Sequence, residues 1–281
     1  MTTPAKTLEE LRSDIDALDD TIHDALMARA QISDAVRSAK GGAAAVFRPG
    51  REAAVLRRLV ERHHGHLPAL VIIRIWREIM TASSRLQGPF NVAVTTGAAG
   101  GAAGELARDH FGTLTSIVPA ASTAQALSAV AENRAQIALV PIAEDVPDES
   151  WWRSFGAGPG PQLNVLARVP FTADLRTGAA LLIGRQSFDA SGQDHGFIVV
   201  ETLVEVSQAR LRTGLEKAGL RVLGFPAAID DPGAGSLQLA ELVEYVASAD
   251  PRLAQAEQII GEGTRLRSIG GYATPLDLPR R

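Results

Sequence analysis

Residues 7–40 read TLEELRSDIDALDDTIHDALMARAQISDAVRSAK, and this stretch decides how the first third of the chain folds. Its apolar residues recur at steps of three and four, which lays one apolar stripe along a long helix. The first half keeps a heptad rhythm, which is typical of a helix that packs lengthwise on other helices. The stripe residues are Leu8, Leu11, Ile15, Leu18, Ile22, Ile32 and Val36, with Ala25, Leu26 and Ala30 between them.

Cationic side chains interrupt this stripe. Continuing the sevens from Ile15 and Ile22 leads to Arg29, and Lys40 lies further along the same face, while Arg12 lies at its edge. An unpaired cation in a helical core is costly. Arg29 therefore bonds an internal carboxylate, reaches water where the helix bends, or belongs to a cationic pocket between helices.

Two further helices are predicted over residues 51–63 and 68–87. Glu52 opens the apolar face of the first, and Ser83 and Gln87 end the apolar stripe of the second. Cations, one carboxylate and two neutral hydrogen-bonding groups would suit a small dianion that carries a hydroxyl. One long helix with two shorter ones cannot close a bundle alone, so we expect a homodimer.

These residues carry a resemblance to a known family. Residues 7–88 resemble the all-helical chorismate mutases, whose fold is a three-helix module that pairs as an intertwined dimer. The resemblance implies rearrangement of chorismate to prephenate, without cofactor or metal. The matching motifs are Leu11-Arg12 with Ile15 and Leu18-Asp19, Arg29 eleven residues before Lys40, Arg51-Glu52 after a proline, and Ser83 four residues before Gln87.

The resemblance assigns catalytic roles to Lys40, Gln87 and Glu52. Lys40 and Gln87 would contact the ether oxygen, where negative charge grows as the C–O bond breaks. Glu52 would accept a hydrogen bond from the ring hydroxyl. The reaction occurs within one molecule, so holding the substrate in its reactive conformer is the other available effect.

Four more residues are implied in substrate binding. Arg29 would bind one carboxylate, and Arg12 would reach the other from the partner subunit, because planar guanidinium groups suit carboxylates. Ser83 would help to place a carboxylate, and Arg51 would support the site. Isochorismate-pyruvate lyases share this fold and remain an alternative, as does a non-catalytic regulatory protein of the aromatic pathway.

Residues 89–190 alternate strands and helices, which predicts an α/β lobe with a partly parallel sheet. The lobe resembles prephenate dehydratase, a periplasmic-binding-protein-like fold, through a Val-Pro-Ile strand at 140–142. The catalytic motifs of that family are replaced: TTGAAGGAA stands at 95–103, and Gly178-Ala179-Ala180 stands where a Thr-Arg-Phe motif is expected. We therefore expect dehydratase activity to be lost.

Residues 191–281 resemble an altered ACT module of α+β type. Strands are expected at 197–200, 221–223 and 266–272, with helices at 207–218 and 237–247. The stretches that bind phenylalanine in such modules are missing, so feedback by phenylalanine is not expected. The whole chain is thus read as three domains, 1–88, 89–190 and 191–281.

Composition excludes several classes of protein. The chain has 281 residues, a formal net charge of −4 and no cysteine, which excludes disulfides and thiolate sites. It lacks a basic tail, and only 5% of its residues are aromatic, which argues against nucleic-acid binding. No apolar run is long enough for a bilayer, and the N-terminus does not resemble a signal peptide. We expect a cytoplasmic protein.

Overall fold

The computed structural model describes residues 6–39, 47–95, 100–142, 151–153, 155, 162–172, 178–231 and 235–278. Three helices come first: α1 (Leu8–Ala39), α2 (Pro49–Glu61) and α3 (Ala69–Gln87). A mixed α/β region follows, which confirms the expected change of fold after residue 88. Its elements are β1 (Asn91–Thr95), α4 (Gly100–Phe111), β2 (Ser116–Ala120), α5 (Thr123–Ala131), β3 (Ile137–Ile142), β4 (Asn164–Val169), β5 (Ala179–Gly184), β6 (Asp194–Thr202), α6 (Gln208–Lys217), β7 (Val222–Asp231), β8 (Gly235–Leu242), α7 (Pro251–Ile260) and β9 (Arg265–Ala273).

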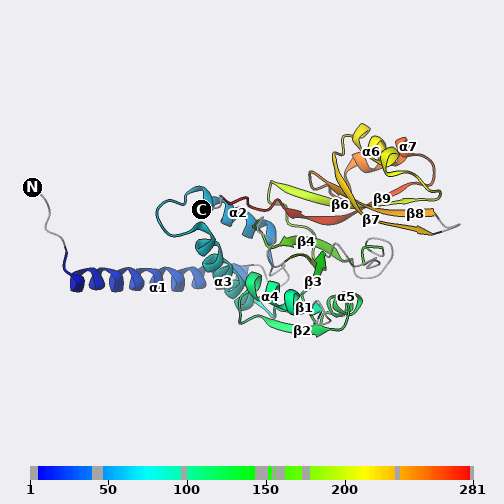
Figure 1. The fold of residues 1–281 in the computed structure, drawn as a ribbon. Helices are drawn as coiled ribbons and strands as arrows, with labels where there is room; N and C mark the ends of the chain where they lie inside the picture. The colour runs from blue at the N-terminus through cyan, green and yellow to red at the C-terminus, as the bar shows by residue number, and fades with distance from the viewer. Residues whose placement is uncertain are drawn as a thin grey trace, which may run out of the picture.

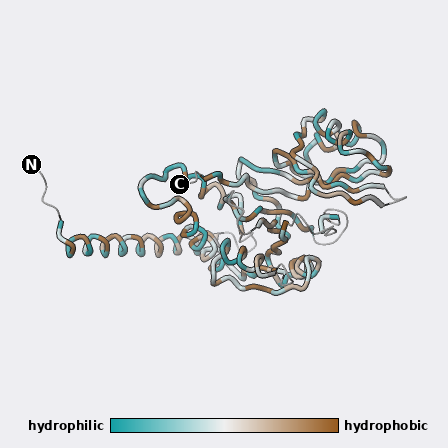
Figure 2. Tube along the Cα trace, viewed as in Figure 1, coloured by the Kyte–Doolittle hydropathy of each residue, from teal (hydrophilic) through white to brown (hydrophobic). Residues whose placement is uncertain are grey.

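Helix α1 begins with a reciprocal cap. The Thr7 hydroxyl accepts the Glu10 N–H at 3.2 Å, and the Glu10 carboxylate accepts the Thr7 N–H at 2.7 Å. The helix then runs away from the rest of the chain as a single rod (Figure 1). Its apolar stripe, visible as brown segments in Figure 2, stays uncovered, with Leu18 62% and Ile32 65% exposed.

Helix α3 uses two faces. Ile73 and Met80 pack with Leu56 of α2 and with Phe171 of the sheet region. Ser83, on another face, meets α1. Because α3 lies between α1 and the sheet region, its most buried residues are not limited to the stripe that ends at Ser83 and Gln87. No helix in the described part of the chain is long and apolar enough to cross a membrane.

The strands form one nine-stranded sheet, in the order β2-β1-β3-β5-β4-β9-β6-β8-β7. β1 pairs in parallel with β2 and β3, while β5 is antiparallel to β3 and β4. This confirms the expected partly parallel α/β lobe. A single pair in register, Val165 with Gly270, joins β4 to β9 and so links the first five strands to the last four.

The last four strands and two helices run β6-α6-β7-β8-α7-β9, with strand order β9-β6-β8-β7. This is the split βαβ arrangement, and it agrees with the expected ACT-like module, which remains a prediction. Helices α6 and α7 lie together on one side of these strands (Figure 1). Leu211 and Leu215 of α6 pack there with Ile198 and Ala240 of the sheet.

The helix expected at 237–247 is wrong: Gly235–Leu242 is strand β8. β8 pairs with β6 on one side and β7 on the other. Leu239 packs into the core beside Trp152, whereas Ala240 and Leu242 face the helices. With apolar residues on both faces, the strand lacks clean alternation and resembles a helical run.

Helix α7 follows β8, at residues where no helix is expected from the sequence analysis, although its sequence holds a start signal. Asp250 accepts the Arg252 N–H at 2.9 Å as N-cap, and Pro251 occupies the first helical position. An Asp-Pro pair after an apolar strand was the clue that the helix begins there.

The β4–β9 joint generates a stability prediction. Gly270 has φ +101°, and an added Cβ would lie 2.1 Å from the Val165 carbonyl oxygen. Gly65 has a similar φ of +99° but open space around it. We expect Gly65→Ala to cost about 1 kcal/mol, from backbone strain alone. Gly270→Ala should lower the free energy of unfolding by at least about 3 kcal/mol in urea titrations, because steric clash adds to strain. Equal losses in both variants would contradict this account of the joint.

Candidate active site

The expected cation Arg29 meets Ser83 between α1 and α3. Arg29 Nη1 donates to Ser83 Oγ at 2.5 Å, and Ser83 Oγ donates in turn to the Ile79 carbonyl at 2.8 Å. The hydroxyl proton is therefore directed at Ile79, which leaves oxygen lone pairs for Arg29. Of the three alternatives for Arg29, the structure places it beside a neutral hydroxyl. No carboxylate in the described part of the chain lies within ion-pairing distance of it.

Burial lowers the pKa of the half-buried Arg29 guanidinium. Arginine nevertheless stays protonated in proteins, so the group is a fixed positive charge. A cation held by a hydroxyl, with no acid beside it among the described residues, can accept an anion without first breaking an ion pair.

Gln87 lies one turn beyond Ser83 on α3. Its Nε2 donates to the Ser83 carbonyl at 3.3 Å, a long and weak bond. The structure thus gathers three of the predicted residues, Arg29, Ser83 and Gln87, where α1 crosses α3.

Arg12 does not join this group within one chain. It lies on the exposed first half of α1, 17 residues before Arg29 (29 − 12). At 1.5 Å per residue that is about 26 Å along the helix. Lys40 lies outside the described residues. Arg51 is exposed near the start of α2, and its backbone N–H donates to Asp189 Oδ2 at 3.1 Å.

Glu52 lies in a different environment. It is buried and accepts from Arg77 Nη1 at 2.8 Å. Arg77 and Ser83 are six positions apart on α3, which turns them about 120° from one another around the helix axis. In a single chain Glu52 therefore faces the sheet region rather than Arg29, and its contact with a substrate stays a prediction.

The Glu52–Arg77 pair belongs to a buried cluster. Arg77 Nη1 also lies 3.4 Å from His110 Nε2, and its guanidinium stacks over the Phe171 ring at 5.5 Å. Because a guanidinium can only donate, Nε2 accepts and the imidazole is neutral. Burial, and then the charge of Arg77, lower the pKa of His110 well below its usual value. Burial raises the pKa of Glu52, against the opposing effect of Arg77.

Sequence reasoning missed Arg77, although its spacing carried a signal. Arg77 falls between Ile73 and Met80 at helical steps, so a charge interrupts an apolar face just as Arg29 does on α1. The prediction followed the neighbouring stripe of α3 and did not consider the face that meets the sheet region.

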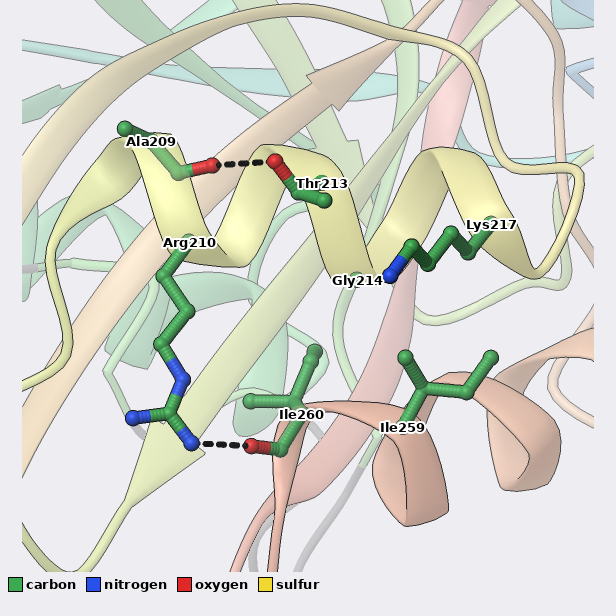
Figure 3. Close-up of a pocket in the computed structure, with 7 residues that line it drawn as sticks. All are labelled: Ala209, Arg210, Thr213, Gly214, Lys217, Ile259 and Ile260. Atoms are coloured by element: carbon green, nitrogen blue, oxygen red, sulfur yellow. Dashed lines mark hydrogen bonds between the residues drawn. The ribbon is translucent and has the colours of Figure 1, made fainter.

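A separate hollow lies between α6 and α7 (Figure 3). Two of its polar side chains are already engaged within the protein. Arg210 donates to the Ile260 carbonyl at 3.1 Å, and Thr213 donates to the Ala209 carbonyl at 2.9 Å. Lys217 and Ile259 complete its rim. The hollow lies along the contact between two packed helices, and none of the predicted site residues lines it.

Comparison with known proteins identifies the helical region. Residues 11–88 match the family model of chorismate mutase type II. The N-terminal helices are thus a chorismate mutase type II domain, as the resemblance implied. The bifunctional chorismate mutase/prephenate dehydratase of Neisseria gonorrhoeae is 37% identical over 112 residues, 38% of this chain and 30% of that protein. Alignments with three such bifunctional enzymes span only 30–39% of their lengths.

Solved structures resemble the chain distantly. One is the quorum-quenching acylase GqqA, at 15% identity and a TM-score of 0.48, which covers 66% of this chain and 95% of that one. Another is a prephenate dehydratase from Arthrobacter aurescens, at 12% identity and 0.48, which covers 68% and 92%. Likenesses of this size assign no activity to the sheet region.

The neutral His110 generates a prediction about pH. The unfolded chain binds a proton on this imidazole near pH 6.5, whereas the folded chain does not. Stability should therefore fall as pH drops below 6.5, by up to about 1.4 kcal/mol per pH unit from this group. Glu52 acts in the opposite direction, since its raised pKa favours the folded state at acid pH.

Urea titrations from pH 7 to pH 5 would measure this slope. His110→Gln should remove the part due to the imidazole, and His66→Gln, which changes an exposed imidazole in the α2–α3 loop, is the matched control. An unaltered slope in the His110 variant would show that the group already titrates normally in the folded protein.

Proposed function

We propose that this chain is a chorismate mutase, an isomerase that rearranges chorismate to prephenate in aromatic amino-acid biosynthesis in the cytoplasm. The match of residues 11–88 supports the activity. The observation that carries the proposal is the half-buried Arg29, held by Ser83 and beside Gln87, with no acid to neutralise it among the described residues.

Each residue then has a role in a rearrangement within one molecule, which the site would accelerate by placing the substrate and by stabilising charge. Arg29 and Ser83 bind one carboxylate of the substrate dianion, which fixes the enolpyruvyl arm against the ring. Gln87 and Lys40 donate to the ether oxygen as its charge grows. Glu52 accepts from the ring hydroxyl, and Arg51 supports the site. The reaction needs neither nucleophile nor electron carrier.

The active form in this proposal is a homodimer. Most of the apolar stripe of the 32-residue helix α1 is exposed, and burying it would stabilise the folded state by the hydrophobic effect. Arg12 lies too far from Arg29 to serve the same site, so a second copy would have to bring Arg12 to it. Pairing two α1 helices would meet both requirements.

The domains proposed are 1–88, 89–190 and 191–281, with dehydratase activity lost from the second. The named relatives are bifunctional. Within the segment 95–103, which replaces one dehydratase motif, residues 96–99 lie outside the described residues. Ala179 and Ala180 belong to β5, and Ala179 places a methyl group where the expected motif has an arginine.

Two other functions stay open to test. An isochorismate-pyruvate lyase would use the same helices on a related dianion. A regulatory protein would bind chorismate without turning it over. The gathered Arg29, Ser83 and Gln87 favour an enzyme, because each provides a contact that the mutase reaction requires.

Product analysis tests the proposal directly. Purified protein incubated with chorismate should give prephenate alone, resolved by chromatography, with no phenylpyruvate above the blank. Phenylpyruvate would show that the sheet region retains dehydratase activity. Consumption of isochorismate but not chorismate would support the lyase, and binding without turnover would support the regulatory protein.

Variants of the cations test the site. Arg29→Ala and Lys40→Ala should each reduce kcat/KM by about 1,000-fold or more, because each removes a charged contact worth about 4 kcal/mol in the transition state. Both proteins should remain folded dimers by circular dichroism and sedimentation. Arg85→Ala, which removes an exposed guanidinium from α3, is the matched control and should keep full activity. Near-normal turnover in either site variant would contradict the role proposed for that residue.

A further inference from the structure

The first turn of α2 lacks a cap from its own sequence. Its N-cap residue, Arg48, makes no side-chain cap, and Pro49 at the first helical position has no N–H to donate. The third helical residue, Arg51, has an N–H that normally bonds the N-cap side chain. Here that N–H donates to Asp189 Oδ2 at 3.1 Å, so the cap comes from a residue 138 positions away.

Asp189 also holds the residue before the helix. Its Oδ1 accepts from Arg48 Nη2 at 2.9 Å, so one carboxylate bonds both Arg48 and Arg51. Nearby, Gln186 Nε2 donates to the Phe47 carbonyl at 2.6 Å. Gly50 completes the contact, because an added Cβ would lie 1.8 Å from the Asp189 carbonyl oxygen. The β5–β6 connection therefore lies directly against the start of α2.

The same connection holds α2 further along. Arg57 donates to Ser191 Oγ at 2.8 Å and to the Gln193 carbonyl at 2.9 Å. It also donates to the Thr274 carbonyl, just after β9, at 3.0 Å. These bonds come from a buried guanidinium. They attach α2 to one end of the antiparallel pair that β6 and β9 form, where the start of β6 lies beside the end of β9.

The connection also contacts the C-terminal module. The Phe188 ring lies 4.4 Å from the Tyr245 ring, which follows β8. Phe188 is the residue before Asp189, so a shift of the β8–α7 segment would reach the cap of α2 through one peptide unit.

Charge links Asp189 to Glu52 as well. Glu52 faces Arg77 of α3, which in turn meets His110 of α4, and it also feels the negative charge of Asp189. The Asp189 charge contributes to the raised pKa of Glu52, after burial. Asp189 thus acts on Arg51 through a hydrogen bond and on Glu52 through its charge.

We propose that Asp189 is a positioning residue for the mutase site: it fixes the first turn of α2, and with it Arg51 and Glu52, from the connection between the α/β lobe and the C-terminal module. The inference rests on the proposed function, since it assumes that Arg51 and Glu52 serve the reaction. It makes the helical domain dependent on the sheet region for its correct geometry.

The test uses full-length protein and three variants. Asp189→Ala removes both hydrogen bonds and the charge. Asp189→Asn removes the charge but keeps an oxygen that can accept the Arg51 N–H, since asparagine is an effective N-cap. Glu205→Ala removes an exposed acid from the β6–α6 loop and is the matched control for net charge.

We expect Asp189→Ala to lower kcat/KM by about fivefold to tenfold, the factor that corresponds to one lost cap. Asp189→Asn should keep most of the wild-type kcat/KM. In both Asp189 variants the acid limb of the kcat/KM profile should move to lower pH, because the pKa of Glu52 falls when the neighbouring charge is removed. Glu205→Ala should change neither quantity. A general loss of stability would not produce rescue by asparagine together with a shifted pH profile.

Amide exchange of residues 50–54, followed by mass spectrometry, tests positioning without turnover. Exchange should accelerate in Asp189→Ala and stay near wild type in Asp189→Asn and Glu205→Ala. If the wild-type protein leaves chorismate unchanged, the proposed function is wrong. If amide exchange in Asp189→Ala is unchanged from wild type, the inference about Asp189 is wrong. Active wild type, with Asp189→Ala equal to Glu205→Ala in kcat/KM, would also overturn it.

Discussion

The exposed apolar stripe of α1 is the constraint on which the rest of this structure depends. This 32-residue helix has Leu18 and Ile32 more than half exposed, and the described part of its own chain leaves them uncovered. Only its later part is held, by the contact of Arg29 with Ser83. The position of Arg29 and the case for the proposed dimer therefore come from one element. In that proposed dimer the stripe would be covered, and a second copy would bring Arg12 to the site of Arg29.

Helices α2 and α3 differ from α1, because they are bonded to the sheet region of the same chain. The buried Glu52–Arg77 pair, the Phe171 ring and the three bonds of Arg57 attach them to the sheet region. A buried ion pair adds little net stability, since desolvation offsets much of its attraction. The directed bonds of Arg77 and Arg57 nevertheless hold α2 and α3 against the rest of the chain. The mutase domain thus combines a free helix with two fixed ones.

Local signals predicted much of this arrangement from sequence. The heptad rhythm placed α1 correctly, and a charge on its stripe led to Arg29. β8 was misread because both its faces are buried, which erases the period that separates strand from helix. Asp189 could not have been predicted. Its role depends on a contact across 138 residues, and no local pattern encodes where a loop will meet a distant helix.

The place of β9 in the sheet has a consequence for biosynthesis. Residues 265–273 lie between β4 and β6, in the middle of the strand order rather than at an edge. During translation, the strands on both sides leave the ribosome first and wait with unpaired edges for β9. The two halves of the sheet cannot join until residue 273 has been made. The three helices, by contrast, are synthesised within the first 88 residues, whereas the Asp189 carboxylate that caps α2 and the Thr274 carbonyl that Arg57 binds are made only later.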